Sequence, residues 1–347
     1  MESFVQALEK EIIIRKNELE KDVIKTIYFG GGTPSRLNHS QFNQLFEIIF
    51  ANYTIASNAE ITIEANPDDL SNTYVDMLSA LPFNRISIGI QSLNDNELKF
   101  LSRRHDAKTA IESVKYCQAK GFHNISIDLM YGLADQTLEI WQNSLKHACE
   151  LNGQHISAYH LIYEEKTRLF SLLQAGKVVP VDEDNSLEMF EMLIAKLKKE
   201  GFIHYELSNF AKEGFISQHN SSYWKSEKYM GLGPSAHSFD GGHRWWNVSS
   251  LPKYINGINN GDPVFEMEDI DQSKMYNEYI ITRLRTMWGV DLEELKSKFG
   301  AKLYDYFLKN AQKYINLNHL IRKNNTITLT HAGIFISDGI VSDLMIV

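Results

Sequence analysis

Hydrophobic residues along the chain follow two different periods in turn, and this alternation predicts the fold. Runs rich in β-branched and aromatic residues, typical of strands, occupy residues 24–29, 60–64, 85–90, 124–129 and 155–161. Segments with apolar residues at helical spacing occupy residues 4–19, 41–50, 69–80, 94–101, 107–120 and 138–151. Strands that alternate with helices favour a parallel sheet covered by helices. We therefore expect an α/β fold, closed or partly closed as a TIM-type barrel.

The second half of the chain has a different pattern of apolar and aromatic residues. A further helix is expected at residues 186–199, whereas residues 201–250 hold many aromatic residues and few long apolar periods. The proline-bounded segment 252–263 is typical of a turn or linker. Helices at 274–287, 292–299 and 303–315, a hairpin at 320–329 and a last helix at 333–343 complete the pattern.

These patterns suggest three parts. We expect a barrel at residues 1–200, an irregular aromatic-rich segment over the barrel mouth at 201–265, and a small C-terminal α+β domain at 266–347. The last part resembles a winged helix. Because its hairpin tip offers only Arg322 and Lys323 as basic residues, a lid or docking role fits it better than DNA binding.

The charge balance excludes some function classes. The chain has 35 basic and 44 acidic residues, a net charge of −9, which argues against broad nucleic-acid binding. No stretch approaches the roughly 18 apolar residues of a membrane span, and the N-terminus lacks a signal-peptide pattern. We expect a soluble cytoplasmic protein. The two cysteines, Cys117 and Cys149, form no CxxC pair and cannot supply the thiolates of an iron–sulfur cluster.

Three consecutive glycines, Gly30 to Gly32, end the first predicted strand and lead into Thr33 and Pro34. Glycine has no Cβ and readily takes positive φ, so a ligand can lie directly against this backbone. A tight turn between strand and helix is the alternative. Three glycines in a row at a strand's carboxyl end favour the ligand loop, because α/β enzymes place their sites there.

Polar residues also end the next strands, with Glu64, Gln91 and Asp128 in successive positions. The carboxyl ends of parallel strands meet at one face of an α/β barrel, where substrates bind. A single carboxylate there could instead cap a helix. Three polar residues beside a triple-glycine loop favour a binding site.

Five motifs together resemble a known family. They are GGGTP at 30–34, EANP at 64–67, RISIGIQS at 85–92, DLMYGL at 128–133 and YELSNFAK at 205–212. In this order and spacing they are similar to the oxygen-independent coproporphyrinogen III oxidase-like branch of the radical S-adenosylmethionine (SAM) superfamily. The likeness covers nearly the whole chain.

Within that branch the sequence looks more like the HemW-type haem chaperones. His219-Asn220-Ser-Ser-Tyr223-Trp224 matches the HNxxYW signature associated with haem binding in that group, and GLGPSAHS at 231–238 is another of its hallmarks. If the first segment is helical, His219 and Tyr223 lie one turn apart on one face, an imidazole beside an aromatic ring for a porphyrin. The alternative is that His219 only caps a packed aromatic cluster.

The resemblance also implies a set of SAM contacts. Those that match the family's pattern are Gly31, Gly32, Thr33, Glu64, Gln91, Arg103 and Asp128, with Ile162 and His237 as further contact positions. A carboxylate can accept from ribose hydroxyls or an ammonium group, and an arginine can fork onto a carboxylate.

The sequence departs from the family at its N-terminus. There the family has a first barrel strand and a CxxxCxxC triad that binds a [4Fe–4S] cluster, and both are absent before residue 24. Loss of the strand would leave an unpaired sheet edge. We expect Met1 to be a truncated or misassigned start, with a natural cluster-free relative as the alternative.

Three functions follow as hypotheses. The first is a haem chaperone that binds haem and SAM and passes haem to acceptor proteins, with a homodimer possible. The second is an oxygen-independent coproporphyrinogen III oxidase of porphyrin biosynthesis. The third is a cluster-free binding module without catalysis. His219 and His237 are both candidate axial ligands of haem.

Overall fold

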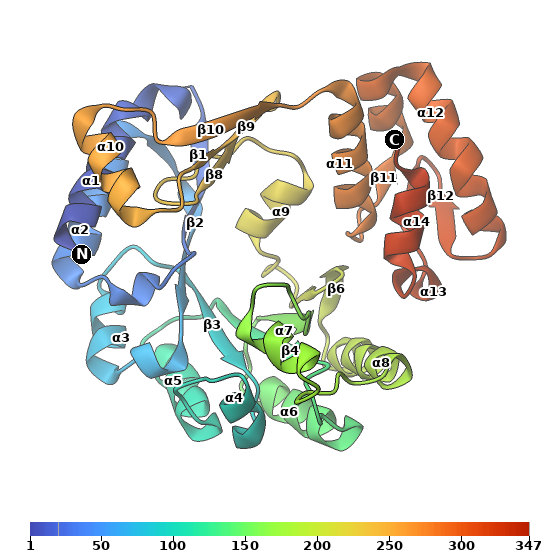
Figure 1. The fold of residues 1–347 in the computed structure, drawn as a ribbon, viewed down its shortest axis with the longest axis horizontal. Coiled ribbons are helices and arrows are strands. Elements are labelled where there is room, and N and C mark those ends of the chain that lie inside the picture. The colour runs from blue at the N-terminus through green and yellow to red at the C-terminus, as the bar shows by residue number, and fades with distance from the viewer. Residues whose placement is uncertain (20, 347) are drawn as a thin grey trace. The chain divides into compact units, whose positions relative to one another are not determined.

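The computed structural model describes residues 1–19 and 21–346 and divides into two compact units (Figure 1). The first unit comprises Met1–Lys25, His39–Ala59 and Gln218–Val347. The second comprises Thr26–Asn38 and Glu60–Ser217. Each unit is described below by itself.

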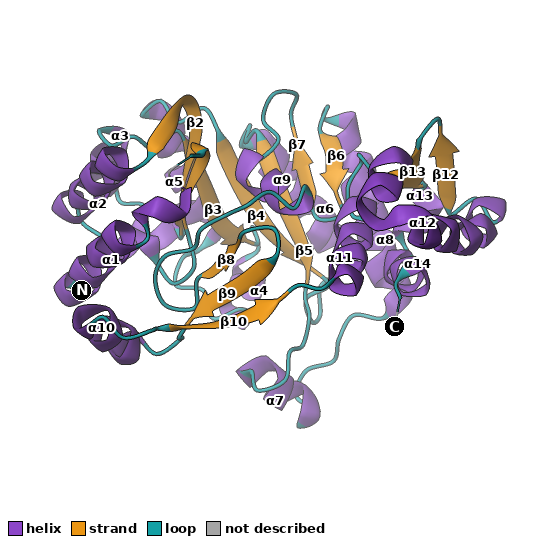
Figure 2. Cartoon of the chain, turned by 90° about the horizontal axis from the view of Figure 1, so that it is seen from above, coloured by secondary structure: helices purple, strands orange, loops and turns teal. Residues whose placement is uncertain are grey.

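A seven-stranded sheet organises the second unit, in the order β1-β2-β3-β4-β5-β7-β6. Its strands are β1 (Val23–Phe29), β2 (Thr54–Ala65), β3 (Arg85–Gln91), β4 (Ile125–Tyr131), β5 (His155–His160), β6 (Ile203–Glu206) and β7 (Asn209–Ala211). Strands β2 to β5 are parallel and lie side by side (Figure 2), whereas β7 is antiparallel to both of its neighbours. The expected partial α/β barrel is thereby confirmed, with a mixed sheet in place of a purely parallel one.

All five predicted strands are present. Strand β2 begins at Thr54, six residues before its prediction, because Ser57 and Asn58 conceal the pattern of a strand. In the central strands β3 and β4, isoleucines alternate with polar or small residues, and Ile86, Ile88 and Ile127 have no exposed surface. β-branched residues at alternate positions made these strands predictable.

Helices follow the strands, all but one of them as predicted, and each begins at a side-chain cap. They are α3 (Asn72–Ser79), α4 (Asp95–Phe100), α5 (Ala107–Ala119), α6 (Leu138–Glu150), α7 (Arg168–Gln174) and α8 (Glu183–Lys199). The Ser71, Asp106 and Thr137 side chains accept a backbone N–H of the first turn of α3, α5 and α6. Helix α7 was not predicted, and none of its residues is buried.

In the first unit, helix α1 (Glu2–Ile14) packs against α2 (His39–Asn52) and α10 (Leu251–Asn260). The predicted helix at 4–19 is therefore wrong in its last turn, where a short 3₁₀ helix, η1 (Lys16–Leu19), follows α1. Tyr254 of α10 is fully buried and lies against Phe4 of α1, with ring centroids 6.4 Å apart.

The prediction of irregular structure at 201–265 is wrong. These residues form β6, β7, helix α9 (Gln218–Trp224), strands β8 (His237–Phe239) and β9 (His243–Asn247), and α10, with β10 (Phe265–Asp269) at the end. Strands β8 to β10 make an antiparallel sheet in which Trp245 and Trp246 face Met267 and Glu266 across the ladder. Aromatic residues favour strands, and short edge strands lack the long periods that identify them in sequence.

The predicted linker at 252–263 is also wrong. Pro252 sits in the first turn of α10, where its missing N–H costs nothing, and Gly261 ends the helix in the left-handed region at φ 78°. Two of the proline and glycine residues that suggested a linker, Pro252 and Gly261, are thus the start and stop signals of a helix.

The C-terminal α+β region has a core of its own. Its elements are α11 (Gln272–Leu284), β11 (Val290–Asp291), α12 (Leu292–Asn316), β12 (Leu320–Lys323), β13 (Thr326–Leu329), α13 (His331–Ile334) and α14 (Ser337–Leu344). The two helices predicted at 292–299 and 303–315 form α12, with a kink at Gly300 (φ 79°). The hairpin turns at Asn324, also at positive φ. The last predicted helix is two helices, α13 and α14.

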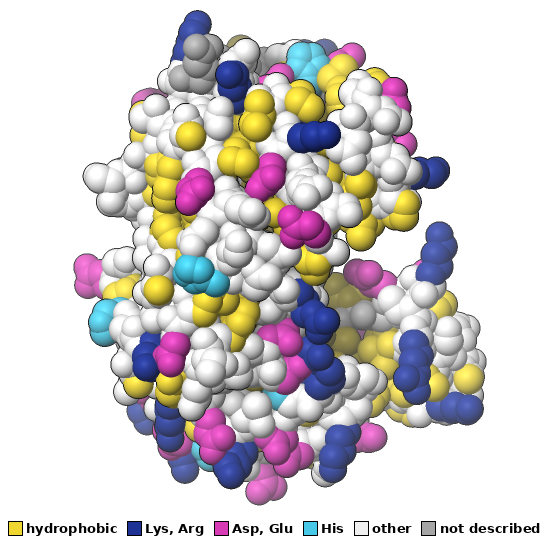
Figure 3. Space-filling view, turned by 90° about the vertical axis from the view of Figure 1, so that its left-hand side faces the viewer, with side chains coloured by type: hydrophobic (Ala, Val, Ile, Leu, Met, Phe, Trp, Pro, Cys, Tyr) yellow, Lys and Arg dark blue, Asp and Glu magenta, His cyan; other side chains and the backbone are white. Residues whose placement is uncertain are grey.

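Surface features agree with the charge analysis. On the face drawn in Figure 3, acidic and basic side chains are interspersed, and no field of one sign covers it. Within residues 1–19 and 21–346, no helix combines the length and the apolar character that crossing a membrane requires.

Candidate functional site

Glu64 fastens the triple-glycine loop to the end of β1. Its Oε1 accepts a hydrogen bond from the Tyr28 hydroxyl at 2.6 Å, and its Oε2 accepts one from the backbone N–H of Gly31 at 3.2 Å. Burial, and then the negative charge of Glu64, raise the pKa of Tyr28, so this hydroxyl keeps its proton and remains a donor. The loop therefore has a defined position relative to the sheet.

The three glycines have different structural roles. A Cβ at Gly30 would lie 2.4 Å from Tyr28 Cε1, so packing requires glycine there. Gly31 has φ +88°, a conformation that costs other residues energy. A Cβ at Gly31 or Gly32 would meet nothing within 4 Å. The backbone of these two residues is exposed, and their contact with a ligand stays a prediction.

Gln91 and Arg103 lie together over Gly89. A Cβ at Gly89 would be 3.0 Å from Gln91 Nε2 and 3.1 Å from Arg103 Nη2. Arg103 Nη2 donates to Asn66 Oδ1 at 3.0 Å and to the Gly89 carbonyl at 2.8 Å, and burial lowers the pKa of Arg103. Gln91 has φ 69°, which is rare and strained for a residue with a side chain.

Asp128 lies further along the same sheet. Its oxygens accept from Ser87 Oγ at 3.2 Å and from Ser126 Oγ at 3.3 Å. Burial raises the pKa of Asp128 to about 6, and the nearby negative charge of Glu64 adds to the shift. The charge of Asp128 in turn acts on Arg103. Glu64, Arg103 and Asp128 therefore share one electrostatic environment at the carboxyl ends of β2 to β4.

This raised pKa leads to a test of stability against pH. Because the pKa of Asp128 is higher in the folded protein than in the unfolded chain, protonation of this group stabilises the fold. This stabilisation is fully present below the unfolded pKa of 3.8 and is lost as the pH rises through about 6. The Asp128→Asn variant has no group that ionises at this position. Its unfolding free energy minus that of the parent should therefore increase by about 1–2 kcal/mol from about pH 4 to about pH 7.5. The Asp128 side chain is partly exposed, so the increase is smaller than the pKa shift alone implies. Urea unfolding at both pH values measures it. An equal difference at both would contradict the assignment.

Asp69 also organises this region but was not predicted as a site residue. Its Oδ2 accepts from Ser35 Oγ at 2.7 Å and from Asn66 Nδ2 at 3.5 Å, and its Oδ1 pairs with Arg104 at 3.2 Å. Asp69 thus connects Ser35, in the segment after the glycines, to Asn66, which accepts a hydrogen bond from Arg103. Only its position in EANPDD, next to a quoted motif, could have indicated this role.

A chain of buried polar groups runs beneath Asp128. Ser126 Oγ lies 2.8 Å from His155 Nδ1, and His155 Nε2 lies 2.7 Å from the Tyr205 hydroxyl. Burial lowers the pKa of His155 well below its ordinary value, so the imidazole is neutral. Pairing between β5 and the distant β6–β7 hairpin brings these residues together, which sequence spacing does not reveal.

The two remaining SAM positions belong to other segments of the chain. Ile162 follows β5 and is 72 % exposed. His237 belongs to the other unit, at the start of β8, where its ring stacks on Trp246 with centroids 5.9 Å apart. The structure leaves the contact of either residue with a cofactor as a prediction.

The second candidate site is helix α9. The segment is helical, as the haem hypothesis requires, and His219 Nε2 lies 3.0 Å from the Tyr223 hydroxyl with the two rings edge to face. Tyr223 is 38 % exposed, although burial of the rest of its surface raises its pKa to about 12. Asn220 and Trp224 are partly buried on the same helix. The helix thus presents an imidazole and a phenol ring together.

Neither cysteine fits a metal cluster. Cys117 is buried in α5, and burial raises the pKa of its thiol to about 12 and that of Cys149 to about 11. Thiols with such pKa values are protonated and poor ligands at neutral pH. Over residues 1–19 and 21–346, no three His, Cys, Asp or Glu side chains gather as a metal site.

Comparisons with known proteins agree with the motifs. Residues 4–148 match the model of the radical SAM superfamily, and residues 270–336 match that of the HemN C-terminal domain. The chain is 34 % identical to the haem chaperone HemW of Bacillus subtilis, over 96 % of this chain and 88 % of that protein. It is 32 % identical to HemW of Lactococcus lactis, over 98 % and 88 %.

A solved structure has the same fold. Coproporphyrinogen III oxidase (HemN) from Escherichia coli superposes with a TM-score of 0.85 and 22 % sequence identity, over 99 % of this chain and 83 % of that one. At this identity the likeness concerns architecture alone.

Proposed function

Because this chain belongs to the radical SAM superfamily, in the branch that contains the HemW haem chaperones, we propose that it binds haem at helix α9 and passes it to acceptor proteins. We also propose that it binds SAM at the carboxyl ends of β1 to β4. The observation that carries the haem proposal is the pairing of His219 with the half-exposed Tyr223 on one face of α9.

Helix α9 fits haem chemically. An imidazole can ligate the iron, and an aromatic ring beside it can pack against the porphyrin plane. The hydroxyl of Ser221 and the indole N–H of Trp224 are buried, and among the described residues neither has a hydrogen-bond partner. Unpaired buried polar groups are costly and mark segments where a ligand or rearrangement is accommodated.

The glycine loop and its neighbours fit SAM. The open backbone of Gly31 and Gly32 would take the methionine end, Glu64 would accept from an ammonium or ribose hydroxyls, and Arg103 with Gln91 would hold polar groups of the cofactor. SAM, when bound, supplies a positively charged sulfonium, which suits the carboxylates of Glu64 and Asp128. The two cysteines do not fit a [4Fe–4S] cluster, so we derive no step through one.

A haem titration tests the proposal. Soret absorbance of ferric haem should saturate with the parent protein, and His219→Ala should weaken binding by at least about tenfold, the equivalent of about 1.4 kcal/mol for a lost axial bond. His243→Ala is the control, since this exposed histidine is paired with Asp240 and belongs to β9. His219→Ala with parent-like affinity would overturn the α9 site. A loss confined to His237→Ala would move the axial ligand to β8.

A further inference from the structure

A row of polar side chains crosses the sheet of the second unit at one level. The register of β2 to β5 pairs its members in turn, and they are Glu64, Ser87, Ser126 and His155. Directly paired residues of neighbouring strands project from the same face of a sheet, and so do residues two apart on one strand. Asp128, two residues after Ser126, therefore shares this face. Hydrogen bonds from the Ser87 and Ser126 hydroxyls join its carboxylate to the row.

The hydrogen-bonded chain from Asp128 to Tyr205 suits either protonation state of the carboxyl group. With Asp128 ionised, Ser126 donates to the carboxylate and accepts from Nδ1–H of His155, whose Nε2 accepts from the Tyr205 hydroxyl. With Asp128 protonated, its O–H donates to Ser126, Ser126 donates to Nδ1, and Nε2–H donates to Tyr205. The three separations are 3.3, 2.8 and 2.7 Å, and hydroxyls and a neutral imidazole both donate and accept. Each bond of the chain is therefore kept in both states.

The charged groups that act on Asp128 leave room for one further positive charge. Arg85 on β3 is buried and lies 4.0 Å from the buried Glu60, so this pair is neutral as a whole. Glu64 on β2 accepts from two neutral donors, a hydroxyl and a backbone N–H. Arg103 then supplies one positive charge against two carboxylates, those of Glu64 and Asp128.

The remaining titratable neighbours add no positive charge. Burial raises the pKa values of two tyrosines that feel the charge of Asp128, so both keep their protons; they are Tyr28 on β1 and Tyr159 on β5. Arg104, which acts on Arg103, lies 2.5 and 3.2 Å from the carboxylates of Asp68 and Asp69. Without a ligand, a protonated Asp128 balances these charges, whereas a ligand of charge +1 is balanced by an ionised Asp128.

We propose that Asp128 gives up its proton when a sulfonium nucleoside binds at the carboxyl ends of β1 to β4, and that this exchange selects SAM over the neutral thioether S-adenosylhomocysteine. This assignment rests on the proposed SAM site. The proton leaves to the solvent, and the chain from Ser126 to Tyr205 reverses its direction. The two nucleosides differ by one methyl group and one positive charge on sulfur, so a response to charge separates them where contacts with the adenosine cannot.

Isothermal titration calorimetry tests this exchange, because titrations in two buffers of different ionisation enthalpy count the protons released. At about pH 5.5 the parent should release about 0.5–1 proton on binding SAM, since Asp128 titrates at about 6. Its affinity for SAM should rise about 5–10-fold from about pH 5 to about pH 6.5, a range below the titration of α-amino groups. S-adenosylhomocysteine should bind with no proton release and with constant affinity.

Asp128→Asn is the decisive variant. It should bind S-adenosylhomocysteine like the parent, which shows that it is folded, but bind SAM with no proton release and no dependence on pH. Its preference for SAM over S-adenosylhomocysteine at about pH 6.5 should fall about 3–10-fold, the range for one partly exposed charge. Asp76→Asn is the matched control, because this carboxylate is 48 % exposed and pairs with Lys120. It should release protons like the parent.

The outcomes separate this exchange from the SAM site itself. Equal proton release with both nucleosides, or release that persists in Asp128→Asn, would overturn the role of Asp128. Binding of SAM by the parent with no proton release would also overturn it and leave the SAM site standing. If the parent binds neither nucleoside, the SAM site is refuted and this exchange with it.

Discussion

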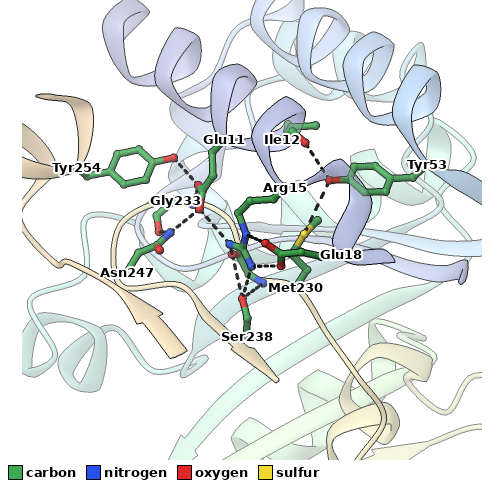
Figure 4. Close-up of polar contacts among 11 residues, drawn as sticks. Glu11, Ile12, Arg15, Glu18, Tyr53, Met230, Gly233, Ser238, Asn247 and Tyr254 are labelled. Atoms are coloured by element: carbon green, nitrogen blue, oxygen red, sulfur yellow. Dashed lines mark hydrogen bonds and ion pairs between the residues drawn. The ribbon is translucent and has the colours of Figure 1, made fainter. Parts of the chain in front are cut away.

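Replacing Glu11 with alanine is expected to lower the free energy of unfolding by about 3–5 kcal/mol, the cost of breaking a buried ion pair from one side. Glu11 is only 1 % exposed, although it belongs to an amphipathic helix near the chain's start. Its two oxygens accept four hydrogen bonds, from Arg15 Nη1 (3.1 Å), Asn247 Nδ2 (2.7 Å), Tyr254 OH (2.6 Å) and Gly233 N (2.8 Å). Figure 4 shows these groups converging on the carboxylate.

The size of the effect follows from what alanine leaves behind. The Arg15 guanidinium would lose its buried carboxylate partner, the Tyr254 hydroxyl and the Gly233 N–H would lose their acceptor, and Asn247 would keep only the Gly233 carbonyl, at 2.9 Å. Burial and the charge of Glu11 raise the pKa of Tyr254, so that hydroxyl stays protonated and needs an acceptor. Helix α1, α10 and the β8–β9 region would lose their common polar contact.

Glu18→Ala is the matched control. Glu18 also receives two hydrogen bonds from Arg15, at 2.8 Å each, but its side chain is 39 % exposed. Water can replace a lost exposed partner, so this variant should lose no more than about 1 kcal/mol. Urea unfolding followed by circular dichroism compares the two. Similar losses for Glu11→Ala and Glu18→Ala would show that the buried carboxylate has no special structural role.

The role of Glu11 illustrates what sequence patterns miss. Apolar spacing in the first helix predicts Ile12 and Ile13 on its buried side, yet Ile13 is 48 % exposed and Glu11 is buried. The partners that make burial of Glu11 acceptable lie more than 200 residues away, in Gly233 and Asn247. A local pattern cannot show that a distant amide and backbone N–H will surround a carboxylate.

The strands and the residues at their ends were predictable for a physical reason. The strands alternate β-branched residues with polar or small ones, a pattern that neighbouring residues alone reveal, and a carboxylate such as Glu64 or Asp128 in a buried strand is conspicuous because carboxylates are rarely buried. Each strand is specified by neighbouring residues in the chain. The hydrogen bond from Tyr28 to Glu64 was not predicted, because an aromatic residue inside a strand is usually interpreted as part of the core.

The prediction for the aromatic-rich stretch 201–265 was wrong because its short strands depend on contacts with residues that are not their neighbours in sequence. Strands β8 and β9 have three and five residues, and their pairing depends on a turn at Asp240 whose carboxylate accepts from the N–H groups of Gly242 and His243. Such short elements are stabilised by tertiary contacts more than by their own propensity. The segment from Gly231 to Ser238, which the sequence identifies only as a family hallmark, ends in β8 of this sheet, and the second large effect is expected there.

Gly231→Ala is expected to destabilise the protein by about 2–3 kcal/mol, at the upper end of the usual cost of overpacking. A Cβ at Gly231 would lie 2.1 Å from the carbonyl oxygen of His237, a backbone atom that no rotamer change can move aside. Gly231 also donates its N–H to Ser238 Oγ at 3.0 Å and accepts from Arg15 at 2.7 Å. Separating residues 231 and 237 would therefore strain the contacts around Arg15 as well.

Gly242→Ala provides the comparison, because a Cβ there would meet only Asp240 Oδ1, at 3.9 Å, and this glycine does not have positive φ. It should change the unfolding free energy by no more than about 0.5 kcal/mol. If both variants are equally stable, close approach at Gly231 is not what requires glycine. If Gly231→Ala is destabilised as expected, close packing explains why the segment GLGPSAHS at 231–238 begins with a glycine. A ligand role for His237 then has to be established by haem or SAM binding, since the motif alone no longer implies it.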